Sequence, residues 1–271
     1  MSRTDRVARS AAPSARRRCG SIGLSQRGLV VSALATLRAQ VRRRLLITYR
    51  VDPDVAASLV PAPLRPQLVN GSAVAGVCMI GLSAVRPGWL RPRFGFRTEN
   101  VAHRVAVEWD DEGGTRTGVY IVERHSSSLL PVLGGGRLFP GVQRRGRFDL
   151  DETKDRFRVR MTAPGIRVAV DVGVGGPWHS ELFSSVEDAS EFHRQGSVGW
   201  SPCAGGGGVE ALELTSKEWA AETGVVHSVE SSFFDSLPQG SAELDSALVM
   251  RDLPFFWDTP RIDLTRGHAV V

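Results

Sequence analysis

The chain has 271 residues, of which 42% are apolar and 23% charged, the balance of a globular protein and not of a chain made of membrane spans. The net charge of +5 is unevenly distributed. Residues 1–50 contain twelve arginines and one acidic residue and carry +11, so residues 51–271 carry −6. The basic character therefore belongs to the N-terminal segment and says little about the fold.

Residues 1–44 form a basic arm that has three open interpretations. It could be a tether to nucleic acid or another acidic surface, a targeting segment rich in Arg, Ser and Ala, or a solvated tail, which we favour on composition. The apolar run at 28–37 is shorter than the roughly 20 residues of a membrane span, and a weak secretory signal stays open. We place the folded domain at residues 45–258 and a tail at 259–271.

The first elements are predicted by local signals. Residues 45–49 are apolar and β-branched, which favours a strand. Asp52 followed by Pro53 is a helix start, so we expect a short helix over 54–60 that ends before Pro61. A long apolar strand is expected over 73–85.

A hairpin follows. Residues 97–109 alternate in character, and the turn signal at 111–114 joins them to a partner strand at 117–123. One face of the first strand carries Val101, His103, Val105, Val107 and Trp109, and the other carries Ala102, Arg104, Ala106 and Glu108. We expect a short helix over 126–133, ended by the glycines at 134–136.

The second half is also mostly strands, expected at 144–150, 155–162, 166–174, 209–215 and 225–234. Ser184 and Glu187 have the spacing of a capping box, which predicts a helix over 184–194. Residues 245–251 are ambiguous. Many strands with few helices predict a β-rich α+β domain, either a curved antiparallel sheet or a barrel.

Two polar clusters meet at one end of the predicted hairpin, because Glu99 and Asn100 precede the first strand and Glu123 and His125 end the second. His125 could act as a general acid or base, although a structural histidine is the simpler interpretation. Arg137 follows three glycines that would let a ligand approach the backbone, so it is a candidate anion contact.

Other site types are not supported by the sequence. It contains no Gly-x-Ser-x-Gly elbow, and the glycines at 205–208 lack the Lys-Ser/Thr of a phosphate-binding loop. Cys19, Cys78 and Cys203 are odd in number and far apart, which indicates a reduced, cytoplasmic protein. They also lack metal-ligand spacing, so we expect no metal or cofactor site.

Four segments follow one another in an order that resembles the YqjF-like domain of unknown function (DUF2071), within the acetoacetate decarboxylase-like superfamily. They are YRVDPDVAASLVPAPLRP (49–66), GVCMIGLSAVRP (76–87), FRTENVAHRVAVEW (96–109) and GVYIVERHSSSLLPVLGGGRLFPG (118–141). The resemblance covers residues 45–258. It implies a cone-like antiparallel β-barrel with a few short peripheral helices and a central pocket.

In the decarboxylases of that superfamily, a lysine after a Phe-Pro step forms a Schiff base with a keto acid. Here Gly141 follows the similar step Phe139-Pro140. The chain has two lysines, Lys154 and Lys217, and both lie in segments with turn character. Glu99 is similar in position to the superfamily's pocket glutamate, which implies that this residue is kept without its lysine.

We therefore expect a protein that binds a small organic anion and is not a Schiff-base decarboxylase. The expected ligand-binding residues are Glu99, Asn100, Glu123, His125 and Arg137, with pocket walls near Cys78, Val107 and Val119. One alternative is a non-covalent acid/base enzyme that uses Glu99 or His125. The other is binding of nucleic acid or an acidic partner through the arm. We expect no membrane partner, and a homo-oligomer stays open.

Overall fold

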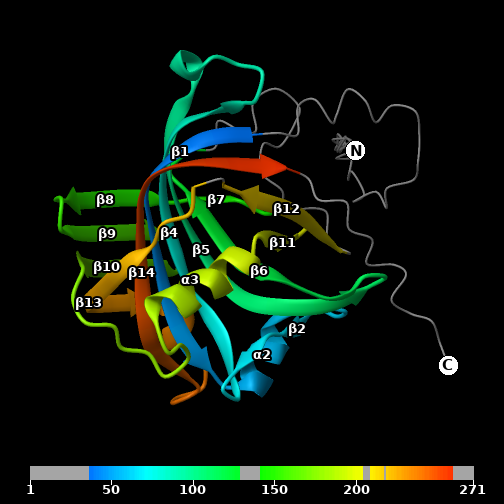
Figure 1. The fold of residues 1–271 in the computed structure, drawn as a ribbon. Coiled ribbons are helices and arrows are strands. Elements are labelled where there is room, and N and C mark those ends of the chain that lie inside the picture. The colour runs from blue at the N-terminus through cyan, green and yellow to red at the C-terminus, as the bar shows by residue number, and fades with distance from the viewer. Residues whose placement is uncertain (1–36, 129–140, 204–207, 217, 259–271) are drawn as a thin grey trace, which may run out of the picture.

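The computed structural model describes residues 37–128, 141–203, 208–216 and 218–258. Figure 1 shows that strands dominate this part of the chain. The described helices are short: α2 (Pro53–Leu59), α3 (Val186–Gln195), α4 (Ser232–Asp235) and the 3-10 turn η1 (Pro92–Phe94). Of the helices described, none has the length and apolar character needed to cross a membrane.

Seven strands form a closed ring. In order around the ring they are β1 (Leu37–Val51), β4 (Ser72–Pro87), β5 (Phe96–Asp111), β6 (Gly114–Ser126), β11 (Val198–Pro202), β12 (Val209–Thr215) and β14 (Ala242–Asp258). Pairing between β14 and β1, from Leu37 opposite Trp257 to Val51 opposite Ala242, closes the path. The ring therefore has an inner and an outer face.

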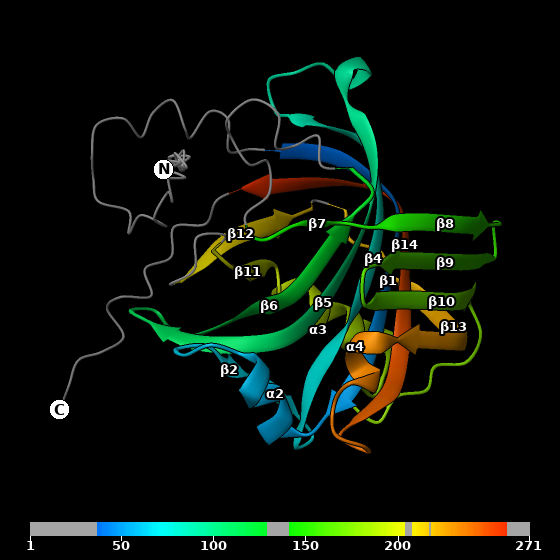
Figure 2. The same cartoon turned by 180° about the vertical axis from the view of Figure 1, so that it is seen from behind.

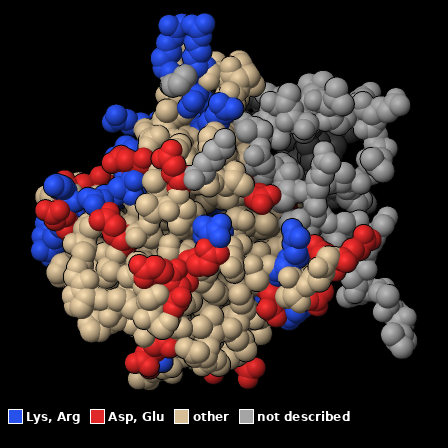
Figure 3. All heavy atoms as spheres, viewed as in Figure 1, with Lys and Arg blue, Asp and Glu red and all other residues tan. Residues whose placement is uncertain are grey.

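A side sheet continues from one strand of the ring. It consists of β13 (Glu222–Ser231), β10 (Ile166–Val174), β9 (Arg156–Ala163) and β8 (Arg147–Glu152), with β13 joined to β14 (Figures 1 and 2). On β9, buried Phe157, Val159 and Met161 alternate with exposed Arg158 and Arg160, so one face of this strand packs on the core and the other is exposed to solvent. Acidic and basic side chains are interspersed over these strands in Figure 3.

Three very short strands complete the sheet. β2 (Arg65–Pro66) pairs with β5, β3 (Leu68–Val69) pairs with β4, and β7 (Arg144–Arg145) pairs with β6.

Two apolar cores lie on opposite faces of the ring strands. Leu45, Ile47 and Val105 belong to the outer core, which the side sheet covers. Leu46 and Ala106, their neighbours in sequence, belong to the inner core together with apolar residues of and before α3. Successive side chains of a strand point to opposite faces, so each long strand supplies both cores.

The local predictions for α2 and α3 are confirmed, with one change at the start of α3. Asp52 caps α2 by accepting hydrogen bonds from the N–H groups of Asp54 and Val55. In α3 the capping residue is Ser185, which accepts from the N–H of Asp188 at 3.0 Å, one position later than the capping-box spacing indicated. The ambiguous segment 245–251 lies inside β14.

Two expectations about the secondary structure were wrong, one on the direction of the strands and one on a helix. The sheet is mixed and not purely antiparallel, because β11 and β7 both run parallel to β6. Parallel neighbours need a long connection, and β11 follows β6 only after β7, β8, β9, β10 and α3. The expected helix at 126–133 is contradicted at its start, since Ser126 is the last residue of β6; positions from 129 lie outside the described residues.

The start of the fold also lies earlier than expected. β1 begins at Leu37, inside the segment that we assigned to the basic arm. Leu37, Ala39 and Val41 are buried in the inner core, and Arg43 and Arg44 are buried as well. Both arginines therefore belong to the folded domain, and the carboxylates that pair with Arg43 lie on the distant strands β5 and β8.

Candidate ligand-binding site

A cavity of about 130 Å³ lies inside the ring, and each of the seven ring strands contributes to its lining. This volume is close to the roughly 150 Å³ of an engineered apolar cavity that binds benzene. The cavity can therefore hold a small organic molecule.

Strand alternation builds the walls. β4 contributes Cys78, Ile80 and Leu82, and β5 contributes Asn100, Ala102 and Arg104, in each case every second residue. Such a spacing places the three side chains of a strand on one face. The inner face of β5 thus carries two polar groups separated by a small alanine.

A β-bulge sets which residues of β6 face the cavity. His103 pairs with Glu123 while Arg104 pairs with Ile121, so Val122 is an extra residue in β6. Val119 and Ile121 line the cavity before the bulge, and Arg124 lines it after the bulge. Without the extra residue, Glu123 and not Arg124 would continue the inner face.

Three arginines from different strands line the cavity: Arg44 of β1, Arg104 of β5 and Arg124 of β6. Burial lowers the pKa of Arg104 and of Arg124 to about 10, so both stay protonated at neutral pH. Glu210 offsets part of the charge near Arg124. The result is a concentration of positive charge in a small, largely apolar space.

Arg44 and Arg104 are 6% and 8% exposed, and neither forms an ion pair with a carboxylate of the described residues. The Arg44 guanidinium lies over the rings of Trp219 and Phe255, at 5.6 and 5.8 Å. Its Nε and Nη1 are buried without a hydrogen-bond acceptor. Buried cations of this kind are costly unless an anion pairs with them.

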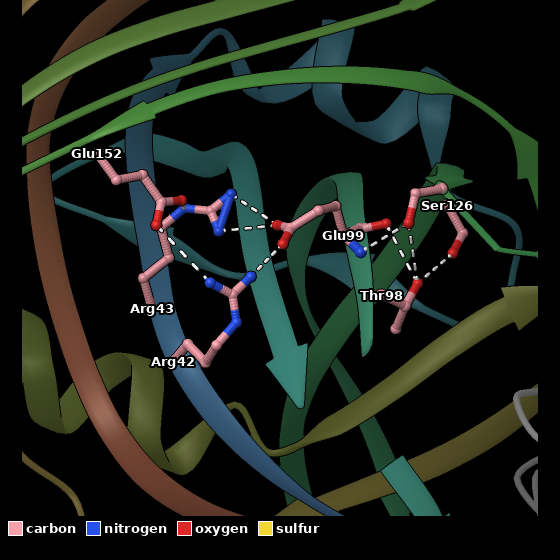
Figure 4. A network of polar contacts seen from close by, with 7 residues as sticks. Arg42, Arg43, Thr98, Glu99, Ser126 and Glu152 are labelled. Carbon is pink, nitrogen blue, oxygen red and sulfur yellow. Dashed lines mark hydrogen bonds and ion pairs between the residues drawn. The ribbon is translucent and has the colours of Figure 1, made fainter. Parts of the chain in front are cut away.

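Glu99 lies on the outer face of β5, where it binds two arginines of β1 (Figure 4). Arg43 donates to Oε2 from Nη1 at 2.8 Å and from Nη2 at 2.7 Å, and Arg42 donates to Oε1. Glu152 of β8 is 3.0 Å from Arg43 Nε. Burial raises the pKa of Glu99, and the two guanidinium groups oppose that shift.

Gly81 of β4 makes room for this ion pair. A Cβ at position 81 would come within 2.3 Å of Arg43 Nη1 and 3.0 Å of Glu99 Oε2. Beside the pair, the hydroxyl of Thr98 is 2.9 Å from that of Ser126, and the N–H of Glu99 donates to Ser127 Oγ at 2.9 Å. The side chain of Glu99 is therefore held by β1, and its backbone N–H by Ser127, which directly follows β6.

His103, Glu123 and His125 form a second cluster on the outer face. Glu123 lies 3.8 Å from each of the two imidazoles, and Arg144 donates to it at 3.1 Å. His103 Nε2 is 2.9 Å from Ser231 Oγ. Burial lowers the pKa of His103 to about 3, with a further contribution from His125, so His103 is neutral at pH 7.

Serine, histidine and glutamate occur together here, as in a hydrolase triad, but the arrangement does not suit catalysis. The imidazole-to-carboxylate distance of 3.8 Å is longer than a hydrogen bond. His103 and Ser231 are buried, and the ring of Phe233 stacks on the imidazole at 4.6 Å. A substrate has no access to the serine, so we interpret the cluster as structural.

The residues expected to bind a ligand are thus separated by the sheet. Asn100 lines the cavity, whereas Glu99, Glu123 and His125 lie on the outer face. Arg137 lies outside the described residues. Of the expected walls, Cys78 and Val119 line the cavity and Val107 belongs to the outer core.

Sequence reasoning missed Arg44, Arg104, Arg124 and Gln143 as cavity residues. For Arg104 a signal was present, because it stands between two alanines on one face of an alternating strand. A charged residue in the small-residue face of a long strand indicates that this face borders a space.

Of the positions relevant to Schiff-base chemistry, Lys154 and Gly141 lie in the part of the chain that the structure describes. Lys154 is exposed in the turn between β8 and β9, and Lys217 lies outside the described residues. Gly141 has a φ of 88°, and a Cβ there would come within 2.5 Å of Ser201 Cβ. Position 141 therefore has no room for a lysine without a shift of β11. The described residues also contain no cluster of three or more potential metal ligands.

Comparison with known proteins identifies a family and a fold. The model of the DUF2071 family, described as an uncharacterized conserved protein, matches residues 38–196. No curated protein matches the chain.

The fold is similar to that of acetoacetate decarboxylase from Legionella pneumophila subsp. pneumophila str. Philadelphia 1, with a TM-score of 0.53, 15% identity, and coverage of 82% of this chain and 84% of that one. An acetoacetate decarboxylase-like enzyme from Sphingomonas wittichii RW1 gives a TM-score of 0.54 with 14% identity, and the match covers 83% of this chain and 90% of that one. The enduracididine biosynthesis enzyme MppR, complexed with pyruvate, gives a TM-score of 0.52 with 15% identity, and the match covers 88% of this chain and 93% of that one.

Proposed function

Since the chain belongs to the DUF2071 family and has the fold of acetoacetate decarboxylase-like proteins, we propose that it binds a small organic anion in the cavity of the ring. In this proposal the seven strands form the wall of a cone-like barrel around the ligand. A carboxylate is the expected anionic group.

The observation that carries the proposal is the position of Arg44, Arg104 and Arg124 around one cavity. Arginine presents several N–H donors in a plane and pairs with carboxylates through two parallel hydrogen bonds. Two of the three side chains are more than nine-tenths buried and have no carboxylate partner among the described residues. A bound carboxylate would compensate this buried charge.

The remaining lining indicates what else the ligand carries. Ile80, Leu82, Leu212 and Leu214 give most of the cavity an apolar surface. Asn100 Nδ2 is buried without an acceptor, so it is available to a ligand oxygen. A short apolar acid with a second oxygen, such as a keto or hydroxy acid, suits this lining, and MppR, which has a similar fold, is complexed with pyruvate.

The proposal does not include imine formation or acid/base catalysis. Lys154 is exposed in a turn, and Gly141 stands where the resemblance would place the lysine. Glu99 and His125, the two candidates for proton transfer, lie on the outer face of the ring. Carboxylate binding needs only the arginines.

Thermal-shift measurements with pyruvate, propionate and the neutral analogue propionamide test this function. Both acids should raise the melting temperature and the amide should not. Arg104→Met should abolish the shift, while Arg160→Met, a matched change at an exposed position of β9, should retain it. The proposal fails if no carboxylate stabilises the protein, or if Arg104→Met responds like the wild type.

A further inference from the structure

Cys78 places a thiol in the arginine-lined cavity. We infer that Cys78 is a covalent modification site for small electrophilic carboxylates, which the surrounding arginines bind and orient. This inference rests on the proposed function, because the same arginines must first bind the carboxylate.

The geometry places the sulfur among the cations. Cys78 lies on β4 between Leu46 of β1 and Ala102 of β5, and its side chain faces the cavity. It is a free cysteine, and it lines the same cavity as Arg44, Arg104 and Arg124. The side chains that line this part of the cavity therefore include both a nucleophile and anion-binding groups.

Arg44 and Arg104 supply an independent indication that a ligand enters this space. Both are more than nine-tenths buried, and both line the cavity. Nε and Nη1 of Arg44 have no acceptor, and Arg104 forms no ion pair with a described carboxylate. A thiol alone would not need two such cations; a carboxylate held beside the thiol would pair with them.

The cations also activate the sulfur. Burial by itself raises the pKa of a thiol, but the nearby Arg44, Arg104 and Arg124 outweigh this effect and lower the pKa of Cys78. The thiolate is the reactive form of cysteine, so its fraction at neutral pH is increased. Most buried cysteines lack such neighbours and are inert.

Two reactions of the Cys78 thiolate need no reactant other than the electrophile and water. In conjugate addition to an α,β-unsaturated carboxylate, the thiolate sulfur bonds to the β-carbon and the π electrons move to the α-carbon. That carbon takes a proton from water, while the proton of the thiol has gone to solvent. In alkylation by an α-halo acid, the carbon–sulfur bond forms as halide leaves.

Matched electrophiles that differ in charge provide the test. Iodoacetate and iodoacetamide, and acrylate and acrylamide, are pairs of nearly equal size. We expect Cys78 to react roughly tenfold faster or more with the acid of each pair, because cationic clefts raise the local concentration of anions by about that factor. Peptide mass spectrometry assigns the adduct to Cys78 and separates it from Cys19 and Cys203.

Two variants isolate the cause. Cys78→Ser should remove the fast adduct. Arg104→Met should slow the acids by a larger factor than the amides, because the amides lose only a part of the thiolate and the acids also lose a carboxylate contact. A rate for the amides that equals or exceeds that of the acids at Cys78, or absence of labelling at this residue, overturns the inference.

Carboxylate binding is measured separately, by the thermal shift of Cys78→Ser with propionate. A shift without labelling in the wild type would refute the modification site and leave the proposed function standing. Absence of both would refute the proposed function as well.

Discussion

Arg43 and Arg44 are neighbours on β1, yet they serve opposite faces of the ring. Arg43 binds Glu99 on the outer face at 2.7 Å, whereas Arg44 lines the cavity on the inner face. The outer cation has a carboxylate partner within the protein and the inner one does not. This contrast separates a structural ion pair from a binding site, although the two residues are identical and adjacent.

The outer pair should matter for stability and not for ligand binding. Arg43 has a side chain that is 1% exposed, so Glu99→Gln would leave this buried cation with only the carboxylate of Glu152, 3.0 Å from its Nε. Removal of one partner from a buried pair typically costs roughly 3–5 kcal/mol. We expect Glu99→Gln to lower the free energy of unfolding in urea by about 3 kcal/mol, with the carboxylate thermal shift retained.

The control for this prediction is Glu108→Gln. Glu108 pairs with the largely exposed Arg65 at 2.8 Å, and exposed pairs contribute about 0–1 kcal/mol. If Glu99→Gln destabilised the protein no more than Glu108→Gln did, the pair would not be the anchor between β1 and β5 that we infer.

A truncation tests where the folded domain starts. Removal of residues 1–44 deletes the first half of β1, including the pairing of residues 37–44 with β14 and β4 that closes the ring at that end. We expect this truncation to lose the cooperative thermal transition. Removal of residues 1–36 keeps every described strand and should retain it. An equally cooperative transition after both truncations would mean that this part of β1 is dispensable.

The sequence predicted β4, β5 and β6 well, because their apolar character and turn signals are local. Val101 to Trp109 showed the alternation of β5, and the turn at 111–114 showed its hairpin with β6. Asp52 showed the start of α2. Each of these features depends on residues close together in the chain, so a single sequence contains the information.

The site could not be predicted in the same way, because it depends on pairings between distant residues. The bulge at Val122 reverses the faces of Glu123, Arg124 and His125, and valine fits a regular strand as well as a bulge. Arg43 looks like part of a basic tail until Glu99, 56 residues away, is placed beside it. Neither relationship leaves a local pattern.

Acid should destabilise the protein through His103. Its pKa is lowered to about 3 in the fold by burial, and is about 6.5 in an unfolded chain. Below pH 6.5 the unfolded state binds a proton that the native state does not, so stability falls as the pH drops toward 3.

Urea unfolding at pH 7.5 and pH 5.0 measures this effect. The wild type should lose about 2 kcal/mol more between these two pH values than His103→Gln does, since each pH unit below 6.5 costs about 1.4 kcal/mol per histidine. The variant His227→Gln, at an exposed position of β13, should behave like the wild type. Equal losses in the wild type and His103→Gln would show that His103 is protonated in the native state.

Finally, keto acids should bind without forming an imine. Incubation with pyruvate and borohydride reduces any Schiff base to a stable amine, which adds mass to the modified lysine. Lys154 is exposed in the turn between β8 and β9 and does not line the cavity, and a side chain at Gly141 would collide with Ser201. We expect a thermal shift with pyruvate but no trapped adduct at pH 7. Lys154→Arg and Lys217→Arg, made separately, locate any adduct that does form. A stoichiometric adduct that disappears in one of them would establish the covalent chemistry that our proposal leaves out, and would identify its lysine.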